Sequence, residues 1–448
     1  MPDSWTPDSW QQKPVAQRVE YPDAPALGAV LDALRRLPPL VTSGEVESLK
    51  LQLAEAARGD RFLLLGGDCA ESFDDCRSEV IAAKVKILLK MSIVLVHGSG
   101  RRVIRMGRLA GQYAKPRSAS TETRDGQTLP SYRGDLINRR GFTLEDRTPD
   151  PTLLLRGYER AALTLNFLRA LVQGGFTDFR HPGLWDLEFV NLARESAEYR
   201  ARMDSVVQSV RFMETLAGRS LSELLSRAEI FAAHEGLHLD YEQAQTRQVP
   251  RRQGWYNLSA HFPWIGDRTR AVDGAHVEYF RGIANPIGVK LGPRSTPEEV
   301  LALCETLNPD NEPGRLTLIH RFGANEVERC LPPLLQAVHR ARRLVLWCCD
   351  PMHGNTITAS SGLKTRNFDD ILRELNAAFD VHRATGTVLG GVHFELTGEN
   401  VTECIGGARG LTEADLTKAY RSDVDPRLNY EQAMEMALLI ARRMSPKG

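Results

Sequence analysis

LVLWCCDPMHGNT, residues 344–356, is an apolar run that ends abruptly in a cluster of candidate metal ligands. Its first four residues are all apolar, as in a parallel strand that is covered on both faces. The candidate ligands follow where such a strand would end, and Gly354 and Asn355 favour a turn after them. Since α/β enzymes commonly build their sites at the carboxyl ends of strands, the stretch predicts an enzyme of this class.

Seven further runs of strand length occur along the chain, and most are separated by helical patterns. The runs are 62–65, 103–106, 256–262, 287–291, 316–320, 388–394 and a weaker one before Asp423. Helical patterns at 297–307, 326–341 and 369–385 lie between them. Eight strand–helix units predict an α/β fold of the (β/α)8, or TIM barrel, type. The alternative is a doubly wound open sheet, which would need a Gly-rich nucleotide fingerprint that the sequence lacks.

Two segments fall outside the repeating units. Residues 1–60 hold a polar, Pro-containing arm with helical patterns at 27–37 and 46–57, and they predict an N-terminal extension that packs on the body or on a partner subunit. Residues 151–247 are helical over more length than one crossover needs, with patterns at 161–171, 189–199, 206–216 and 221–231. We therefore expect a catalytic barrel at 61–448 with a helical insertion at about 190–235, between the second and third strands.

Composition limits the classes of function. The 448 residues are 42% hydrophobic, which is enough for a sizeable core, and 57 basic residues equal 57 acidic ones. No overall field therefore favours nucleic acid or an anionic membrane. No apolar run approaches the roughly 18 residues of a membrane span, and the start lacks the features of a signal peptide. With seven irregularly spaced cysteines, we expect a cytoplasmic protein with no nucleic-acid or membrane partner.

Candidate metal ligands follow four of the expected strands, and a barrel would bring them onto one face. They are Cys69 after the first strand, His353 after the sixth, Glu395 after the seventh and Asp425 after the eighth. One thiolate, one imidazole and two carboxylates suit a divalent ion such as Mn, Fe, Co or Zn. Taken singly, Cys69 also fits a core position, His353 a structural loop, and Asp425 a turn before Pro426.

Cationic side chains gather at the same strand ends. They are Arg108, Arg268, Lys290 and Arg321, with Lys115, Arg117 and the Ser118 hydroxyl in a Gly- and Pro-interrupted loop after the second strand. Such a group indicates a substrate with several negative charges, most simply phosphates. Lys290 interrupts the apolar run IGVKL, so we expect a desolvated charge with a functional role there.

Seven motifs, in order along nearly the whole chain, resemble those of class II 3-deoxy-D-arabino-heptulosonate 7-phosphate (DAHP) synthases, the plant and bacterial type. They are GGDCAESF (66–73), RLAGQYAKPRS (108–118), LSAHFPWIGDRTR (258–270), IANPIGVKLGP (283–293), CDPMHGNT (349–356), GGVHFELTGENVTEC (390–404) and DPRLNYEQA (425–433). The family condenses phosphoenolpyruvate with erythrose 4-phosphate in the first step of the shikimate pathway and releases phosphate. The resemblance implies this metal-dependent activity, with Mn²⁺ or Co²⁺ as the expected ion and Zn²⁺ or Fe²⁺ as alternatives.

The resemblance also implies roles for single residues. The family's metal ligands fall on Cys69, His353, Glu395 and Asp425, its phosphoenolpyruvate contacts on Arg108, Arg268, Lys290 and Arg321, and its erythrose 4-phosphate contacts on Lys115, Arg117 and Ser118. Lys290 is the expected proton donor or acceptor, because burial near other cations should lower its pKa, while Arg268 offsets developing charge.

Two positions depart from the family pattern. Asp267, expected to help catalysis by positioning a water, stands where the family typically has Glu, which sets the carboxylate about one methylene further back. Val424 stands where many relatives have a Cys able to pair with the metal-binding Cys, so that disulfide cannot form here.

Longer members of the family use the arm and added helices for assembly and for feedback inhibition. We therefore expect a homo-oligomer, dimer or tetramer, inhibited by one or more of Trp, Phe and Tyr, with a chorismate mutase as a candidate partner. Two other functions stay open. One is a different metal-dependent phosphosugar aldolase-type barrel that needs no phosphoenolpyruvate, and the other is a silent regulatory paralogue that keeps the barrel as a scaffold.

Overall fold

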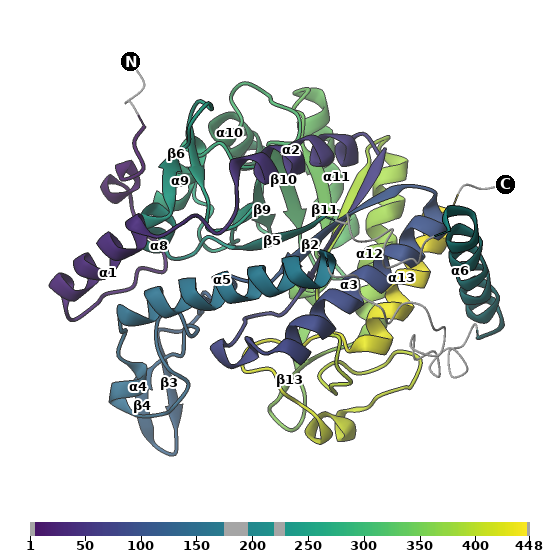
Figure 1. The fold of residues 1–448 in the computed structure, drawn as a ribbon. Coiled ribbons are helices and arrows are strands. Elements are labelled where there is room, and N and C mark those ends of the chain that lie inside the picture. Colours follow the sequence, from purple (N-terminus) through teal and green to yellow (C-terminus); the bar gives the residue numbers. More distant parts are fainter. Residues whose placement is uncertain (1–4, 174–195, 219–228, 446–448) are drawn as a thin grey trace.

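Eight parallel strands close into a barrel that is surrounded by helices (Figure 1). The structure is a computed structural model and describes residues 5–173, 196–218 and 229–445. The strands are β1 (Arg61–Gly67), β2 (Arg102–Arg108), β5 (Ile230–Glu235), β8 (Phe262–Ile265), β9 (Ile287–Leu291), β10 (Leu316–His320), β11 (Leu346–Cys349) and β14 (Leu389–Glu395). They follow the order β1-β14-β11-β10-β9-β8-β5-β2 around the barrel, which confirms the expected fold class.

Helices connect most of these strands. They are α1 (Ala24–Arg36), α2 (Ser43–Ala57), α3 (Ser78–Ser99), α4 (Leu144–Arg147), α5 (Thr152–Gln173), α6 (Ser196–Ala217), α8 (Leu239–Ala244), α9 (Ala275–Gly282), α10 (Pro297–Leu307), α11 (Val327–Arg340), α12 (Phe368–Ala384) and α13 (Tyr430–Met444). Three hairpins complete the described part: β3 (Thr121–Arg124) with β4 (Gln127–Pro130), β6 (Thr246–Gln248) with β7 (Trp255–Asn257), and β12 (Thr356–Thr358) with β13 (Lys364–Arg366). Among the described helices, none is both long and apolar enough to cross a membrane.

The N-terminal segment covers one end of the barrel. Helix α2 begins with a capping box between Thr42 and Glu45, and its apolar residues recur at helical spacing. Leu49 and Leu53 join a cluster of interior barrel side chains that includes Trp264, and α2 packs against β1, β11 and β14. Because only three residues separate the end of α2 from the start of β1, this contact lies at the N-terminal ends of the strands. The C-terminal ends are thereby left for the site.

Five of the expected strands match barrel strands closely, at β1, β2, β9, β10 and β14, and that at 345–347 overlaps β11. The expected strand at 256–262 was wrong in its extent, because the chain forms β7 first and enters the barrel only at Phe262. The weak strand before Asp423 was also wrong, since that region is loop. β5 is the one barrel strand that was not expected from the sequence. Its residues IFAAHE continue the apolar helical spacing of the preceding residues, and because they are buried on both faces they show no alternation of apolar and polar residues.

Between β2 and β5 the structure describes helices α5 and α6, which include the expected helical patterns at 161–171 and 206–216, and α5 lies before the insertion expected at about 190–235. The expected helical pattern at 221–231 was wrong at its end, because residues 230–231 begin β5. The rest of that pattern up to residue 228, and most of the pattern at 189–199, lie outside the described residues. Because β5 is the third barrel strand, the strands after it are numbered one higher than expected. His353 follows the seventh barrel strand, Glu395 ends the eighth, and Asp425 lies in the loop after that strand rather than after a strand of its own.

Helices α3 and α13 make a close contact that yields the first testable prediction. A Cβ added at Gly98 would lie 2.5 Å from Ala441 Cβ and 3.1 Å from its Cα, so Gly98→Ala must push the two helices apart. We expect a loss of about 1–3 kcal/mol in the free energy of unfolding, measured by denaturant titration. Gly28→Ala in α1 is the matched control, because no atom lies within 4 Å of the added Cβ and the helix should gain about 0.5–1 kcal/mol. Equal effects of the two changes would contradict the packing argument.

Candidate active site and metal centre

A cavity of about 500 Å³ opens at the C-terminal ends of the barrel strands. Ten of the twelve residues singled out from the sequence line it: Arg108, Lys115, Arg117, Ser118, Asp267, Arg268, Lys290, Arg321, His353 and Asp425. The other two, Cys69 and Glu395, are buried beside it. Arg108, Lys290 and Glu395 lie on barrel strands and the others on loops that follow them, so the barrel brings together residues more than 350 positions apart.

The four candidate metal ligands converge. Single ligand atoms of Cys69, Glu395 and Asp425 all lie within 4.8 Å of one another, with Cys69 Sγ 3.5 Å from Asp425 Oδ2. His353 lies beside this group rather than within the same 4.8 Å spacing, and its Nε2 is 2.9 Å from Glu395 Oε1. Sulfur, nitrogen and two carboxylate oxygens at this spacing fit a divalent first-row transition metal.

The contacts of His353 support this fit. Its Nδ1 lies 2.7 Å from Asp350 Oδ2, while its Nε2 faces Glu395. Burial lowers the pKa of His353, and a neutral ring has only one N–H to offer to two carboxylates. If Nδ1 donates to Asp350, the Nε2 lone pair points at Glu395. That is the arrangement of a histidine whose one nitrogen binds a metal while a carboxylate accepts a bond from the other.

The carboxylates of the group are ionised and the thiol is not. Burial alone would raise the pKa of Glu395 and Asp425, but neighbouring groups, among them Lys115 and Arg366, hold both below their usual range. Neither buried oxygen of Glu395 accepts a hydrogen bond. Burial raises the pKa of Cys69 above its usual value, with Glu395 adding to the effect. A bound metal ion would stabilise the thiolate directly, since coordinating thiols are deprotonated.

The ammonium of Lys115 lies within this group. Its Nζ is 2.8 Å from Asp425 Oδ2 and 3.5 Å from Glu395 Oε1, and it also contacts Cys69 Sγ. Burial by itself would lower the pKa of Lys115, but these anionic neighbours raise it above its usual value, so the ammonium offsets their charge.

Lys290 has the environment expected from the sequence. It is 5% exposed, and its Nζ donates to Asp350 Oδ2 at 2.8 Å and lies 3.4 Å from His353 Nδ1. Burial lowers its pKa, and nearby Arg108 adds to the effect. Asp350 therefore orients both Lys290 and His353, and its own pKa is held well below the usual range despite burial, first by His353 and then by Lys290.

The arginines along the cavity are fixed by protein groups. Arg108 donates to the carbonyl oxygens of Asp68 and Cys69, both at 2.7 Å. Arg321 donates to Asp267 Oδ2 at 3.0 Å and to the His353 carbonyl at 3.2 Å. The Asp267 carboxylate therefore orients Arg321, and it also accepts bonds from Arg270 and from the Gly292 N–H, both at 3.0 Å.

At the rim of the cavity, Arg268 donates to Ser118 Oγ at 2.7 Å, which joins two loops that are 150 residues apart. The guanidinium of Arg117 lies 3.8 Å from Glu122. The N-terminal arm supports the loop that carries Arg117, because Gln17 Oε1 accepts a hydrogen bond from the Arg117 backbone N–H at 2.9 Å.

Several residues of the site were missed from the sequence. Glu235 ends β5 and lines the cavity, and it could have been found only with that strand. Arg366 and Lys364, on β13, contact Glu395 Oε2 and Asp425 Oδ1, each at 2.8 Å. Nothing in the sequence around β13 distinguishes them from surface cations. Asp68, next to Cys69, is buried between Lys84 and Arg427, each 2.5 Å away.

Comparisons with known proteins agree on one family. The model of the class-II DAHP synthetase family matches residues 5–441. A phospho-2-dehydro-3-deoxyheptonate aldolase of Neurospora crassa is 47% identical over 453 residues, covering 98% of this chain and 94% of its own. One of the same name from Streptomyces coelicolor is 46% identical over 434 residues, covering 97% and 96%.

A solved structure of the phospho-2-dehydro-3-deoxyheptonate aldolase of Francisella tularensis covers 92% of this chain and 96% of its own, at 14% identity and a TM-score of 0.49. The assignment of the fold rests on the barrel topology itself. The family model, which spans nearly the whole chain, and the two relatives show that the chain belongs to the class-II DAHP synthetase family.

Proposed function

We propose that the chain condenses phosphoenolpyruvate with D-erythrose 4-phosphate to form DAHP and phosphate. The observation that carries the proposal is the convergence of Cys69, His353, Glu395 and Asp425 beside a cavity lined by cations. Two phosphorylated substrates need such a lining, and the names of the two relatives describe the same product.

We further propose that these four residues hold a divalent metal ion. Mn²⁺ and Co²⁺ are the expected ions, and Zn²⁺ and Fe²⁺ suit the same donors. Lewis acidity toward the aldehyde oxygen of erythrose 4-phosphate is the chemistry that such an ion supplies.

The side chains of the cavity account for the remaining requirements. Arg108, Arg268, Arg321 and Lys290 would bind phosphoenolpyruvate, and Arg117 and Ser118, with Lys115 nearby, would bind the phosphate of erythrose 4-phosphate. Carbon 3 of phosphoenolpyruvate attacks the aldehyde carbon, and carbon 2 then takes up a water. The resulting phosphohemiketal loses phosphate by cleavage of its carbon–oxygen bond.

In this scheme Lys290 donates or accepts a proton, which its lowered pKa supports. The arginines hold the anions in place and offset the charge that develops. Asp267 keeps Arg321 oriented and is the candidate for positioning the water.

Assembly and control are proposed from different features. Exposed Phe212, Met213 and Leu216 on α6 form an apolar surface of the kind that partner subunits cover, which supports a homo-oligomer, dimer or tetramer. The 1–60 segment and the helices between β2 and β5 are the proposed location for inhibition by Trp, Phe or Tyr, and a chorismate mutase remains the candidate partner. The seven free cysteines support a cytoplasmic location.

The first measurement is the loss of phosphoenolpyruvate absorbance on chelator-treated protein, with and without erythrose 4-phosphate. We expect consumption that needs both substrates and returns when Mn²⁺ or Co²⁺ is added. Binding of metal without loss of phosphoenolpyruvate would favour the phosphosugar aldolase, and failure to bind either metal or substrate would favour the silent paralogue.

Cys69→Ala tests the ligand set. Because a direct ligand is lost, we expect Mn²⁺ affinity, measured by calorimetric titration, to fall by more than the roughly 10–100-fold that loss of an outer partner causes. Cys304→Ala is the matched control, since Cys304 is equally buried but lies on α10, outside the cavity. Unchanged Mn²⁺ affinity in the Cys69 variant would remove Cys69 from the site.

Substitution of the α6 surface tests assembly and control together. Phe212→Glu with Leu216→Glu places two charges on the apolar surface, and we expect gel filtration to show a smaller assembly with weaker inhibition by aromatic amino acids. Arg211→Glu reverses a charge on another side of the helix and should leave both unchanged. A wild-type chain that elutes as a monomer and responds to no aromatic amino acid would contradict this part.

A further inference from the structure

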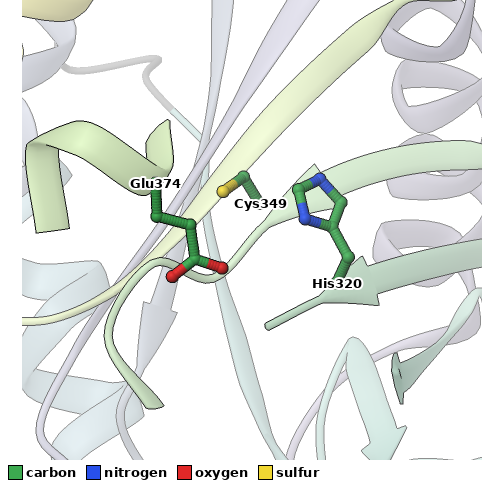
Figure 2. A group of neighbouring side chains, drawn as sticks. All are labelled: His320, Cys349 and Glu374. Atoms are coloured by element: carbon green, nitrogen blue, oxygen red, sulfur yellow. The ribbon is translucent and has the colours of Figure 1, made fainter. Parts of the chain in front are cut away.

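Glu374, on α12, places a buried carboxylate behind the proposed active site. Figure 2 shows it near the thiol of Cys349 and the ring of His320, between α12 and the ends of β10 and β11. Glu374 is 0% exposed, and both of its oxygens accept hydrogen bonds. Oε1 accepts from the Phe322 N–H at 2.8 Å, and Oε2 accepts from Asn355 Nδ2 at 2.7 Å.

The two donors belong to loops that carry site residues. Phe322 directly follows Arg321, in the loop after β10, and Asn355 follows His353 by two positions, in the loop after β11. Asn355 links the loops as well, because its Oδ1 accepts from the Ala324 N–H at 2.9 Å. A single carboxylate therefore connects the backbone beside Arg321 with the turn that presents His353.

The loops also touch where both residues are glycine. A Cβ on Gly354 would lie 2.3 Å from the Gly323 nitrogen, and one on Gly323, whose φ is +88°, would lie 2.8 Å from the Gly354 oxygen. Arg321 meanwhile donates to the His353 carbonyl at 3.2 Å. With the loops in such close contact, a shift of one must move the other, so their relative position depends on the groups that hold them from behind.

A second metal site is the competing interpretation of this region. His320, Cys349 and Glu374 place ligand atoms within 4.8 Å of one another, and neither ring nitrogen of His320 has a hydrogen-bond partner. The low negative charge of these three side chains argues against a divalent metal ion. Burial raises the pKa of Glu374 to about 7, whereas the carboxylates beside Cys69 are held ionised. The Phe322 ring also stacks on the His320 ring, with centroids 5.6 Å apart.

We propose that Glu374 is a positioning residue that sets the place of Arg321 relative to His353 through the Phe322 N–H and Asn355. The inference rests on the proposed function, in which Arg321 binds phosphoenolpyruvate and His353 binds the metal ion. Removing the carboxylate leaves two donors without an acceptor, and the loops must move to satisfy them.

Glu374→Gln tests this with little change of volume, since its amide can accept from only one of the two donors and presents an N–H₂ group to the other. In the full-length enzyme we expect the KM for phosphoenolpyruvate and the Kd for Mn²⁺ each to rise by about 10–100-fold. The KM for erythrose 4-phosphate should change much less, because the proposed contacts Arg117 and Ser118 belong to another loop.

Two further variants separate positioning from packing. Leu375→Ala, at the next position of α12 and 1% exposed, should lower the Tm and leave both constants unchanged. Asn355→Ala, at a half-buried position, should reproduce the Glu374→Gln effects, and the double variant should be no worse than either single one. Asn355→Ala also tests the proposal by itself if the Glu374 variant does not fold.

The outcomes are distinct. A fall in Tm of Glu374→Gln with unchanged KM and Kd would overturn the proposal in favour of packing. A fall from two bound Mn²⁺ per chain to one would overturn it in favour of a second metal site. The titration of Mn²⁺ needs no turnover, so a loss of affinity would support the positioning of His353 even if the wild-type enzyme failed to consume phosphoenolpyruvate.

Discussion

The buried carboxylate of Glu395 is the constraint on which the site depends. It ends β14 with no exposed surface, and a charge in that position is costly unless cations or a metal surround it. Arg108 approaches from β2, Lys115 from the loop that follows, and Arg366 from β13, at 3.2, 3.5 and 2.8 Å. Arg108 and Lys115 come from one segment, β2 and the loop after it, whereas Arg366 comes from β13, so satisfying one carboxylate requires the barrel to be closed and the loops above it to be in place.

Two further buried acids hold residues in or next to the site. Asp350 orients Lys290 and His353, and Asp68 joins Lys84 to Arg427, two positions beyond Asp425. Asp350 accepts hydrogen bonds from two different segments and Asp68 forms ion pairs with two, so each fixes a relative position rather than a single side chain. Precision of this kind is what a mixed metal and phosphate site needs, because small displacements of a ligand or a cation weaken both.

The sequence predicted the parts of this arrangement that have a local signal. β9 and β10 were placed at their observed bounds because each is a short, mostly apolar run that is buried along its whole length, and Lys290 stood out as the one charge within β9. β5 was missed because its apolar residues continue a helical spacing, and Glu235 was missed with it. Asp425 was placed at the right end of the barrel for the wrong reason, since it lies in a loop and not after a strand. Arg366 and Lys364 approach the site only through tertiary packing, which leaves no pattern in the sequence.

The position of α2 has a consequence for the movement of small molecules. The helix covers the N-terminal ends of three strands, and the side chains of Phe262 and Trp264 fill the barrel above it. The barrel of the described residues is therefore solid from its base to the floor of the cavity. Small molecules that enter the cavity cannot leave through the barrel, so arrival and release both take place at the face formed by the C-terminal ends of the strands.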